Sequence, residues 1–113
     1  VNVPFWEADP EGRILWCNAA FAKLLGVSTE DLKDYGWLSM VARDDIARVK
    51  HDILSSGSHD HHVDYHVHVS GVVNLLNIKT RWRRVTNHEG DTVRYVGTVI
   101  GSEQVKAERG GNK

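Results

Sequence analysis

Apolar and polar residues alternate along two stretches in the second half of the chain. From Val63 to Val69, every second residue is apolar or aromatic and the residues between are His or Asp. From Asn74 to Thr86, one set of alternate positions carries Leu76, Ile78, Thr80 and Trp82, and the other carries Asn77, Lys79, Arg81 and Arg83. A period of two is typical of antiparallel strands with one buried face. We expect two strands joined by a turn at Ser70-Gly71, and a cationic, solvent-facing side on the second strand.

Helical spacing replaces this alternation in the first half of the chain. Phe21, Leu24 and Leu25 lie three and four positions apart on one helical face. Asn18 is a good N-cap before them, and Gly26 is placed to end the helix. The sequence therefore predicts a short helix between these two residues.

Two further helices are expected before the alternating stretches. Ser28 opens an acidic capping sequence for a second short helix. A longer helix has its apolar residues on one face, namely Ile46, Val49, Ile53 and Leu54. We expect Gly57 to close this longest helix.

Strands are expected on both sides of the helices. Residues 4–8 and 14–17 are separated by Asp9-Pro10-Glu11-Gly12, where Pro favours a turn and Gly accepts a positive φ. Residues 92–101 follow a turn-rich connector and form the last expected strand, and a helix is expected from Ser102 to Arg109.

This order of elements predicts an α+β fold with one antiparallel sheet and short helices gathered on one face. The 113 residues suffice for one ordinary domain with a single core. We expect a domain over residues 1–101, followed by an exit helix and linker over residues 102–113.

Composition excludes some classes of partner and location. The formal net charge is −1 and charges of both signs are mixed along the chain, so nothing indicates direct contact with nucleic acid. Cys17 is the single cysteine and cannot form an internal disulfide. No apolar run is long enough to span a membrane. We therefore expect a cytoplasmic protein.

Several separated strings resemble those of one family. Asp9-Pro10-Glu11-Gly12 leads through a strand and Asn18 into the first short helix, Tyr35-Gly36-Trp37-Leu38 precedes Arg43-Asp44-Asp45, and Tyr95-Val96-Gly97-Thr98-Val99 lies in the last strand. Together they resemble a PAS domain of the subgroup with Gly-Trp and Pro-Asp-Asp motifs. The resemblance covers almost the whole chain.

The resemblance implies a five-stranded antiparallel sheet in the order 2-1-5-4-3, with helices over one face around a small pocket. It also implies a sensory or dimerisation module connected to an effector domain in the same polypeptide, such as a histidine kinase or a transcription regulator. Two segments depart from the subgroup. Ala42-Arg43 stands where His-Pro is frequent, and Gly101-Ser102-Glu103 replaces the Asp-Ile-Thr that commonly couples the last strand to the output helix.

Large apolar residues on the assigned inner faces form the candidate ligand pocket. These residues are Trp37, Met40, Val49, Ile53, Tyr65, Val67 and Trp82. Dense packing of the same residues is the alternative, because a small domain must bury its large apolar side chains somewhere. The sequence leaves both interpretations open.

Histidines cluster on the first alternating strand, at His59, His61, His62, His66 and His68. His66 and His68 lie on one face about 6.5 Å apart and are the weak metal candidates, whereas a third ligand would have to come from elsewhere. A pH-responsive, exposed strand is the favoured interpretation. If it lies in a dimer interface, protonation of these imidazoles would weaken the dimer.

The familiar PAS cofactors do not match the chain. The haem-binding branch has a His on the long helix, but His51 lies too close to the closing Gly. The covalent flavin branch needs a Cys on the short helix that corresponds to Gly36–Val41, and none is present there. The ligand stays unknown, and non-covalent flavin stays open.

No motif in the sequence indicates catalysis. The chain has no Gly-Lys-Ser/Thr phosphate loop, no Gly-x-Ser-x-Gly elbow and no His-Glu-x-x-His helix. We therefore expect a non-enzymatic sensory module that relays pocket occupancy or partner contact to a C-terminal effector. The alternatives are a ligand-free homodimerisation scaffold, using the outer sheet face or the terminal segments, and a metal site on the histidine-rich strand.

Overall fold

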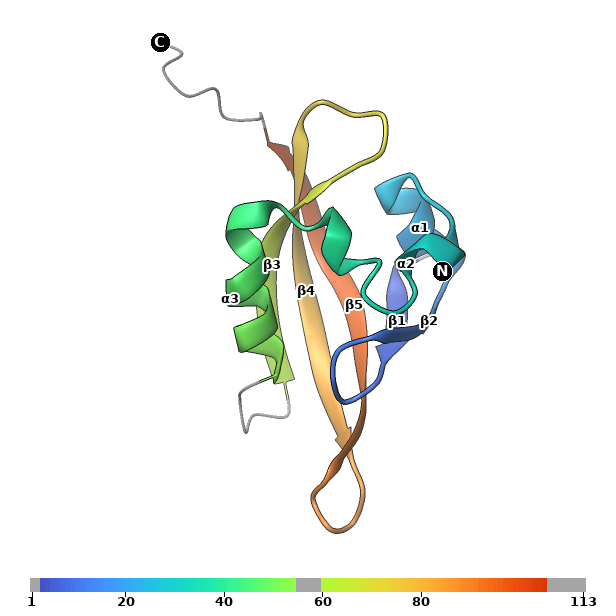
Figure 1. The fold of residues 1–113 in the computed structure, drawn as a ribbon, viewed down its shortest axis with the longest axis vertical. Coiled ribbons are helices and arrows are strands. Elements are labelled where there is room, and N and C mark those ends of the chain that lie inside the picture. Colours follow the sequence, from blue (N-terminus) through green and yellow to red (C-terminus); the bar gives the residue numbers. More distant parts are fainter. Residues whose placement is uncertain (1–2, 55–59, 106–113) are drawn as a thin grey trace.

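The strands form one antiparallel sheet in the order β2-β1-β5-β4-β3 (Figure 1). The computed structural model describes residues 3–54 and 60–105. The strands are β1 (Phe5–Ala8), β2 (Ile14–Cys17), β3 (Asp60–His68), β4 (Leu75–Thr86) and β5 (Thr92–Val105). The first and last strands of the chain are therefore neighbours, and the expected strand order is confirmed.

Helices lie over one face of this sheet, also as expected. They are α1 (Ala19–Leu25), α2 (Thr29–Leu32), the 3-10 helix η1 (Leu38–Met40) and α3 (Arg43–Leu54). Figure 1 shows α3 running along β3 at one side of the sheet, whereas α1 and α2 lie at the opposite side, near β1 and β2. The chain crosses between these two groups through η1.

The predicted capping residues start and end the short helices. Asn18 Oδ1 accepts a hydrogen bond of 3.1 Å from the backbone N–H of Phe21. Gly26 ends α1 with φ at +72°, a conformation that favours glycine. Ser28 and Asp31 form a reciprocal capping box at the start of α2.

The alternation in β3 and β4 also has the predicted orientation. Val63, Tyr65 and Val67 of β3 are buried, as are Ile78, Thr80 and Trp82 of β4. Among the cations of β4, Lys79 and Arg83 are exposed and Arg81 is half-buried on the outer face.

The helix expected from Ser102 does not begin there. β5 continues to Val105, and its pairing with β4 runs from Ser102↔Ile78 to Val105↔Leu75. The register shifts at a β-bulge, where Ile100 is the extra residue between the pairs Thr80↔Val99 and Lys79↔Gly101. The rest of the expected exit helix, together with Gly57 and His59, lies outside the described residues.

Candidate functional site

The residues predicted to form the pocket come together between the helices and the sheet. Six of them are at most 4% exposed and belong to one core cluster, namely Trp37, Val49, Ile53, Tyr65, Val67 and Trp82. Met40 is partly buried and packs against the same cluster. The sequence-based grouping of these seven residues therefore corresponds to a real neighbourhood in the fold.

Aromatic rings make up the centre of this interior. Trp82 of β4 lies 5.4 Å from Trp37 and 5.5 Å from Trp6, measured between ring centroids. Trp37 also lies 6.2 Å from Tyr65. The indole N–H of Trp37 donates a 3.0 Å hydrogen bond to the carbonyl of Gly12, so the β1–β2 turn fixes this ring.

Among the buried side-chain atoms of the described residues that have no hydrogen-bond partner, three belong to this aromatic group. They are the hydroxyl of Tyr65 and the indole N–H groups of Trp6 and Trp82. Burial raises the pKa of Tyr65, which keeps its hydroxyl protonated. Buried donors are normally satisfied by protein or ordered water, so this core contains unused donors among apolar side chains.

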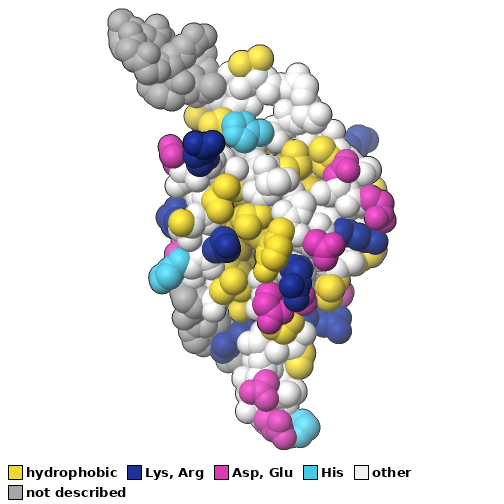
Figure 2. Space-filling view, in the orientation of Figure 1, with side chains coloured by type: hydrophobic (Ala, Val, Ile, Leu, Met, Phe, Trp, Pro, Cys, Tyr) yellow, Lys and Arg dark blue, Asp and Glu magenta, His cyan; other side chains and the backbone are white. Residues whose placement is uncertain are grey.

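The helix-bearing face is partly apolar on its surface. Figure 2 shows hydrophobic side chains along the middle of this view, between α3 and the α1–α2 group, with Lys, Arg, Asp and Glu around them. Some of the charged groups lie between these hydrophobic side chains (Figure 2). The surface over the aromatic interior is therefore mixed, with apolar and charged side chains side by side.

The histidines do not form one cluster. His62 and His68 are exposed, whereas His61 is only 8% exposed. Burial lowers the pKa of His61, and the nearby charge of Arg84 adds to this effect. The alternation along β3 extends back to His61 and is the sequence signal that places this residue on the inner face.

His66 has a specific partner on α3. Asp45 Oδ2 accepts a hydrogen bond of 2.8 Å from the backbone N–H of His66 and lies 3.0 Å from its ring Nδ1. Within residues 3–54 and 60–105, no three His, Cys, Asp or Glu side chains are grouped as metal ligands. His66, one of the two weak metal candidates, therefore ties α3 to β3, whereas the other, His68, is exposed.

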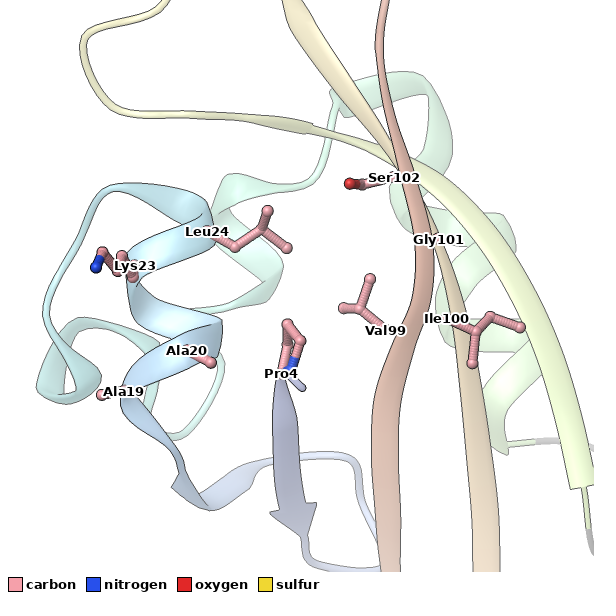
Figure 3. A pocket seen from close by; sticks show the side chains of 9 residues that line it. All are labelled: Pro4, Ala19, Ala20, Lys23, Leu24, Val99, Ile100, Gly101 and Ser102. Atoms are coloured by element: carbon pink, nitrogen blue, oxygen red, sulfur yellow. The ribbon is translucent and has the colours of Figure 1, made fainter. Parts of the chain in front are cut away.

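A second site, not predicted from the sequence, lies between α1 and the far end of β5. This cleft has a volume of about 640 Å³ and is lined by nine residues (Figure 3). Leu24 and Ala20 of α1 face Val99 and Ser102 of β5 across it, and Pro4 closes one end. None of the seven predicted pocket residues lines it.

The bulge in β5 explains why sequence alternation did not reveal this cleft. Strict alternation would put Val99 and Ser102 on opposite faces. In the structure Val99 pairs with Thr80, and Ser102 pairs with Ile78. Because Thr80 and Ile78 are both buried, the extra residue returns Ser102 to the inner face.

Comparisons with known proteins identify the fold. The model of the PAS domain family matches residues 1–56. A solved PAS domain from Colwellia psychrerythraea superposes with a TM-score of 0.74 at 15% identity, covering 94% of this chain and 88% of that one. The chain belongs to the PAS domain family.

Other solved PAS structures resemble this PAS domain over similar spans. A sensory box histidine kinase/response regulator from Burkholderia thailandensis has a TM-score of 0.66 and 24% identity, covering 93% of this chain and 78% of that one. The N-terminal domain of a diguanylate cyclase with PAS/PAC sensor from Marinobacter aquaeolei has a TM-score of 0.65 and 16% identity, covering 87% and 93%. A search of curated proteins found no match.

The exposure of two residues bears on cofactor and redox chemistry in this PAS domain. His51 on α3 is exposed. Cys17 is 4% exposed, and burial raises the pKa of its thiol, which favours the neutral form. In the described part of the chain, no helix is both long and apolar enough to cross a membrane.

Proposed function

We propose that this PAS domain is a non-enzymatic sensory module whose ligand occupies the aromatic interior. The binding residues are Trp37, Met40, Val49, Ile53, Tyr65, Val67 and Trp82. The observation that carries the proposal is the buried Tyr65 hydroxyl without a hydrogen-bond partner. Leaving such a group unsatisfied costs about 1–3 kcal/mol, which a ligand acceptor would recover.

The chemistry of the side chains in the aromatic interior indicates the kind of ligand. Tyr65 and Trp82 offer donors, and the surrounding side chains are aromatic or aliphatic. Aromatic rings bind flat apolar groups by stacking or by edge contact. A neutral, planar molecule with a carbonyl or ring-nitrogen acceptor fits this combination best.

Contacts from Trp82 provide a route for the signal. Trp82 pairs with Gly97 of β5 and packs against Tyr95, with ring centroids 5.9 Å apart. β5 continues from there to Val105, toward the C-terminal side of the chain. A ligand that favours one position of Trp82 would therefore shift the population of β5 arrangements. An effector domain in the same polypeptide and a cytoplasmic location belong to this proposal.

Tyr65→Phe tests the proposal, with Tyr35→Phe as control because the Tyr35 hydroxyl already donates to the carbonyl of Glu11 at 2.9 Å. Native mass spectrometry of wild-type protein should detect a retained small molecule, and Tyr65→Phe should weaken its binding about tenfold. In the ligand-free protein, Tyr65→Phe should leave the free energy of unfolding unchanged or raise it. Destabilisation of the ligand-free protein, with unchanged ligand retention, would contradict the proposal.

The outer face of the sheet favours a second function, homodimerisation without a ligand. Trp16 is 48% exposed there and contacts Phe5 edge-on at 5.9 Å. A shallow hollow of about 170 Å³ beside Phe5 is bordered by Arg81 and Arg83. His62, His66, His68 and Arg81 extend the same contact surface. Sedimentation equilibrium of the wild type and of Trp16→Glu tests this function, which predicts a dimer that the substitution dissociates.

A further inference from the structure

The sheet has three stretches of edge, and local structure covers the stretch along β3. The backbone N–H of His66 donates to Asp45, and its carbonyl accepts a 2.8 Å hydrogen bond from the N–H of Ala42. Arg48 donates a 2.7 Å hydrogen bond to the carbonyl of Asp64. Unpaired strand edges bind other strands, and these contacts use the groups that such a strand would need.

The edge along β2 is covered in a similar way. Ile14 and Asp34 form an antiparallel bridge, in which each backbone N–H donates to the other residue's carbonyl at 2.9 Å. The segment before η1 therefore protects the short strand β2. Each of the two outermost strands thus has some of its outward backbone groups occupied by contacts within the chain.

The third stretch of edge belongs to β5 and lies beyond the end of β1. β1 pairs with β5 only as far as Phe5↔Thr98, followed by a 3.3 Å hydrogen bond from the N–H of Val99 to the carbonyl of Pro4. Pro4 has no N–H with which to continue the ladder. The side chain of Asn18 binds the carbonyl of Val3 at 2.8 Å and so directs this group away from β5.

The edge that remains presents regularly spaced backbone groups. Val99 directs its N–H toward β1, and backbone groups of an antiparallel strand point to alternate sides. The bulge opposite Lys79 shifts this alternation by one residue, so Ser102 and Gln104 also point toward the β1 side of β5. Their N–H and carbonyl groups point away from β4. Among residues 3–54 and 60–105, no strand pairs with β5 along this side after Val99.

The cleft described above lies directly beside this edge, in line with β1. Its walls are mainly apolar, and Leu24 and Val99 point into it (Figure 3). Lys23 contributes its stem, but its amine points away from the cleft. An occupant would therefore meet backbone hydrogen-bonding groups on one side and uncharged side chains on another.

We propose that this β5 edge binds an extended peptide segment with small, uncharged, apolar side chains at alternate positions. The peptide adds a strand to β5 and directs every second side chain into the α1 cleft. A second copy of the chain is a poorer occupant, because nine residues line the cleft whereas a specific dimer interface uses about 20–30 residues a side. This binding site is separate from the small-molecule site proposed in the interior.

A titration followed by amide NMR tests the proposal on the whole chain. The probe is a synthetic pentapeptide, acetyl-Thr-Val-Thr-Val-Thr-amide, added up to millimolar concentrations. Saturable shifts should appear at residues 99–105, and the amide hydrogens of Ser102 and Gln104 should exchange more slowly when the peptide is bound. The same peptide with N-methyl groups at alternate residues should bind about tenfold more weakly, because it lacks the N–H donors.

Two variants with a matched control complete the test. Ala20→Leu should fill the cleft and weaken probe binding about tenfold, whereas Ala47→Leu, at an exposed position of α3 that does not line the cleft, should not change it. Ser102→Pro removes an edge N–H without removing a bond to β4 and should weaken binding similarly. Absence of probe binding, or equal binding by all variants and by the N-methylated peptide, would overturn the proposal. So would a wild-type dimer that Ser102→Pro dissociates, since the occupant would then be a second copy.

Discussion

Gly97 leaves room in β5 for the indole ring of Trp6. A Cβ atom at this position would lie 2.3 Å from two atoms of that ring, far inside van der Waals contact. Gly97→Ala should therefore lower the free energy of unfolding by about 2–3 kcal/mol, measured by urea denaturation. The packing of the tryptophan, and not backbone conformation, is the reason.

Gly101→Ala is the matched control on the same strand. The nearest atom to a Cβ there is Lys79 Cδ at 3.6 Å, an ordinary contact. Its effect should stay within about 0.5 kcal/mol. Equal effects of the two substitutions would mean that strand propensity, and not the indole, sets the requirement for glycine.

Asn18 joins two elements, since it caps α1 and also holds the start of β1. Its Oδ1 accepts from the backbone N–H groups of Phe21 and Phe5, each at 3.1 Å. Asn18→Ala should lower the free energy of unfolding by about 2 kcal/mol, because it removes a cap and leaves a strand N–H unsatisfied. Ser28→Ala, which removes the cap of α2 alone, should cost about 1 kcal/mol in the same thermal or urea unfolding experiment. A larger loss for Ser28→Ala would contradict the dual role of Asn18.

Asp45 joins α3 to β3 through its carboxylate. Burial by itself would raise the pKa of Asp45, but the hydrogen bonds from His66 and the charges of His66 and Arg48 outweigh it and lower the pKa below 3.8. A lowered carboxyl pKa contributes stability above the unfolded-state pKa, and this contribution is lost as the pH falls through the folded-state value.

Asp45→Asn should therefore be less stable than wild type by about 1 kcal/mol at neutral pH. The difference should shrink below about pH 4, as measured by urea unfolding at several pH values. Asp44→Asn makes the same charge change one residue away at an exposed position, and it should show no such pH dependence. A difference that persists at pH 3 would argue against a charge-based contact.

Sequence patterns predicted those elements whose signals are local. Asn18, Gly26 and Ser28 carry capping information that acts within four residues, and they start or end helices as predicted. The alternation in β3 and β4 indicates which side chains of each strand are buried, and the two strands pair in a register that puts both buried sets on one face. The length of β5 was not predictable in this way, because Gly101-Ser102-Glu103 has weak strand propensity and forms strand through pairing with β4. The α1–β5 cleft depends on the same bulge and on the distant Pro4, so no local pattern indicates it.

The stability of the whole molecule should fall on acidification in two ranges of pH. The folded state holds the pKa of His61 below 6.5, the value in the unfolded chain. As the pH falls below 6.5, the unfolded chain binds a proton at His61 before the folded protein does, and the free energy of unfolding therefore decreases. The second loss comes at lower pH. The hydrogen bond and charge of Arg81 lower the pKa of Asp60, and the pKa of Asp45 is lowered as well, so protonation of these two carboxyl groups destabilises the folded state.

His61→Gln should remove the upper range, and His62→Gln should retain it because His62 is exposed on the opposite face of the same strand. Urea unfolding between pH 7.5 and 5 measures both variants against wild type. A wild-type curve that is flat over this range, or one that both variants change equally, would show that His61 does not titrate as its burial implies.

The position of β5 between β1 and β4 also governs when the protein can form on the ribosome. Strands β1 and β2 are synthesised first, yet their neighbour in the sheet is the last strand to emerge. Until then Trp6 has no Gly97 to pack against, and the nascent chain exposes both an aromatic surface and an unpaired strand. The sheet can therefore be completed only after β5 has emerged, and a nascent chain that stops short of β5 should be prone to aggregation.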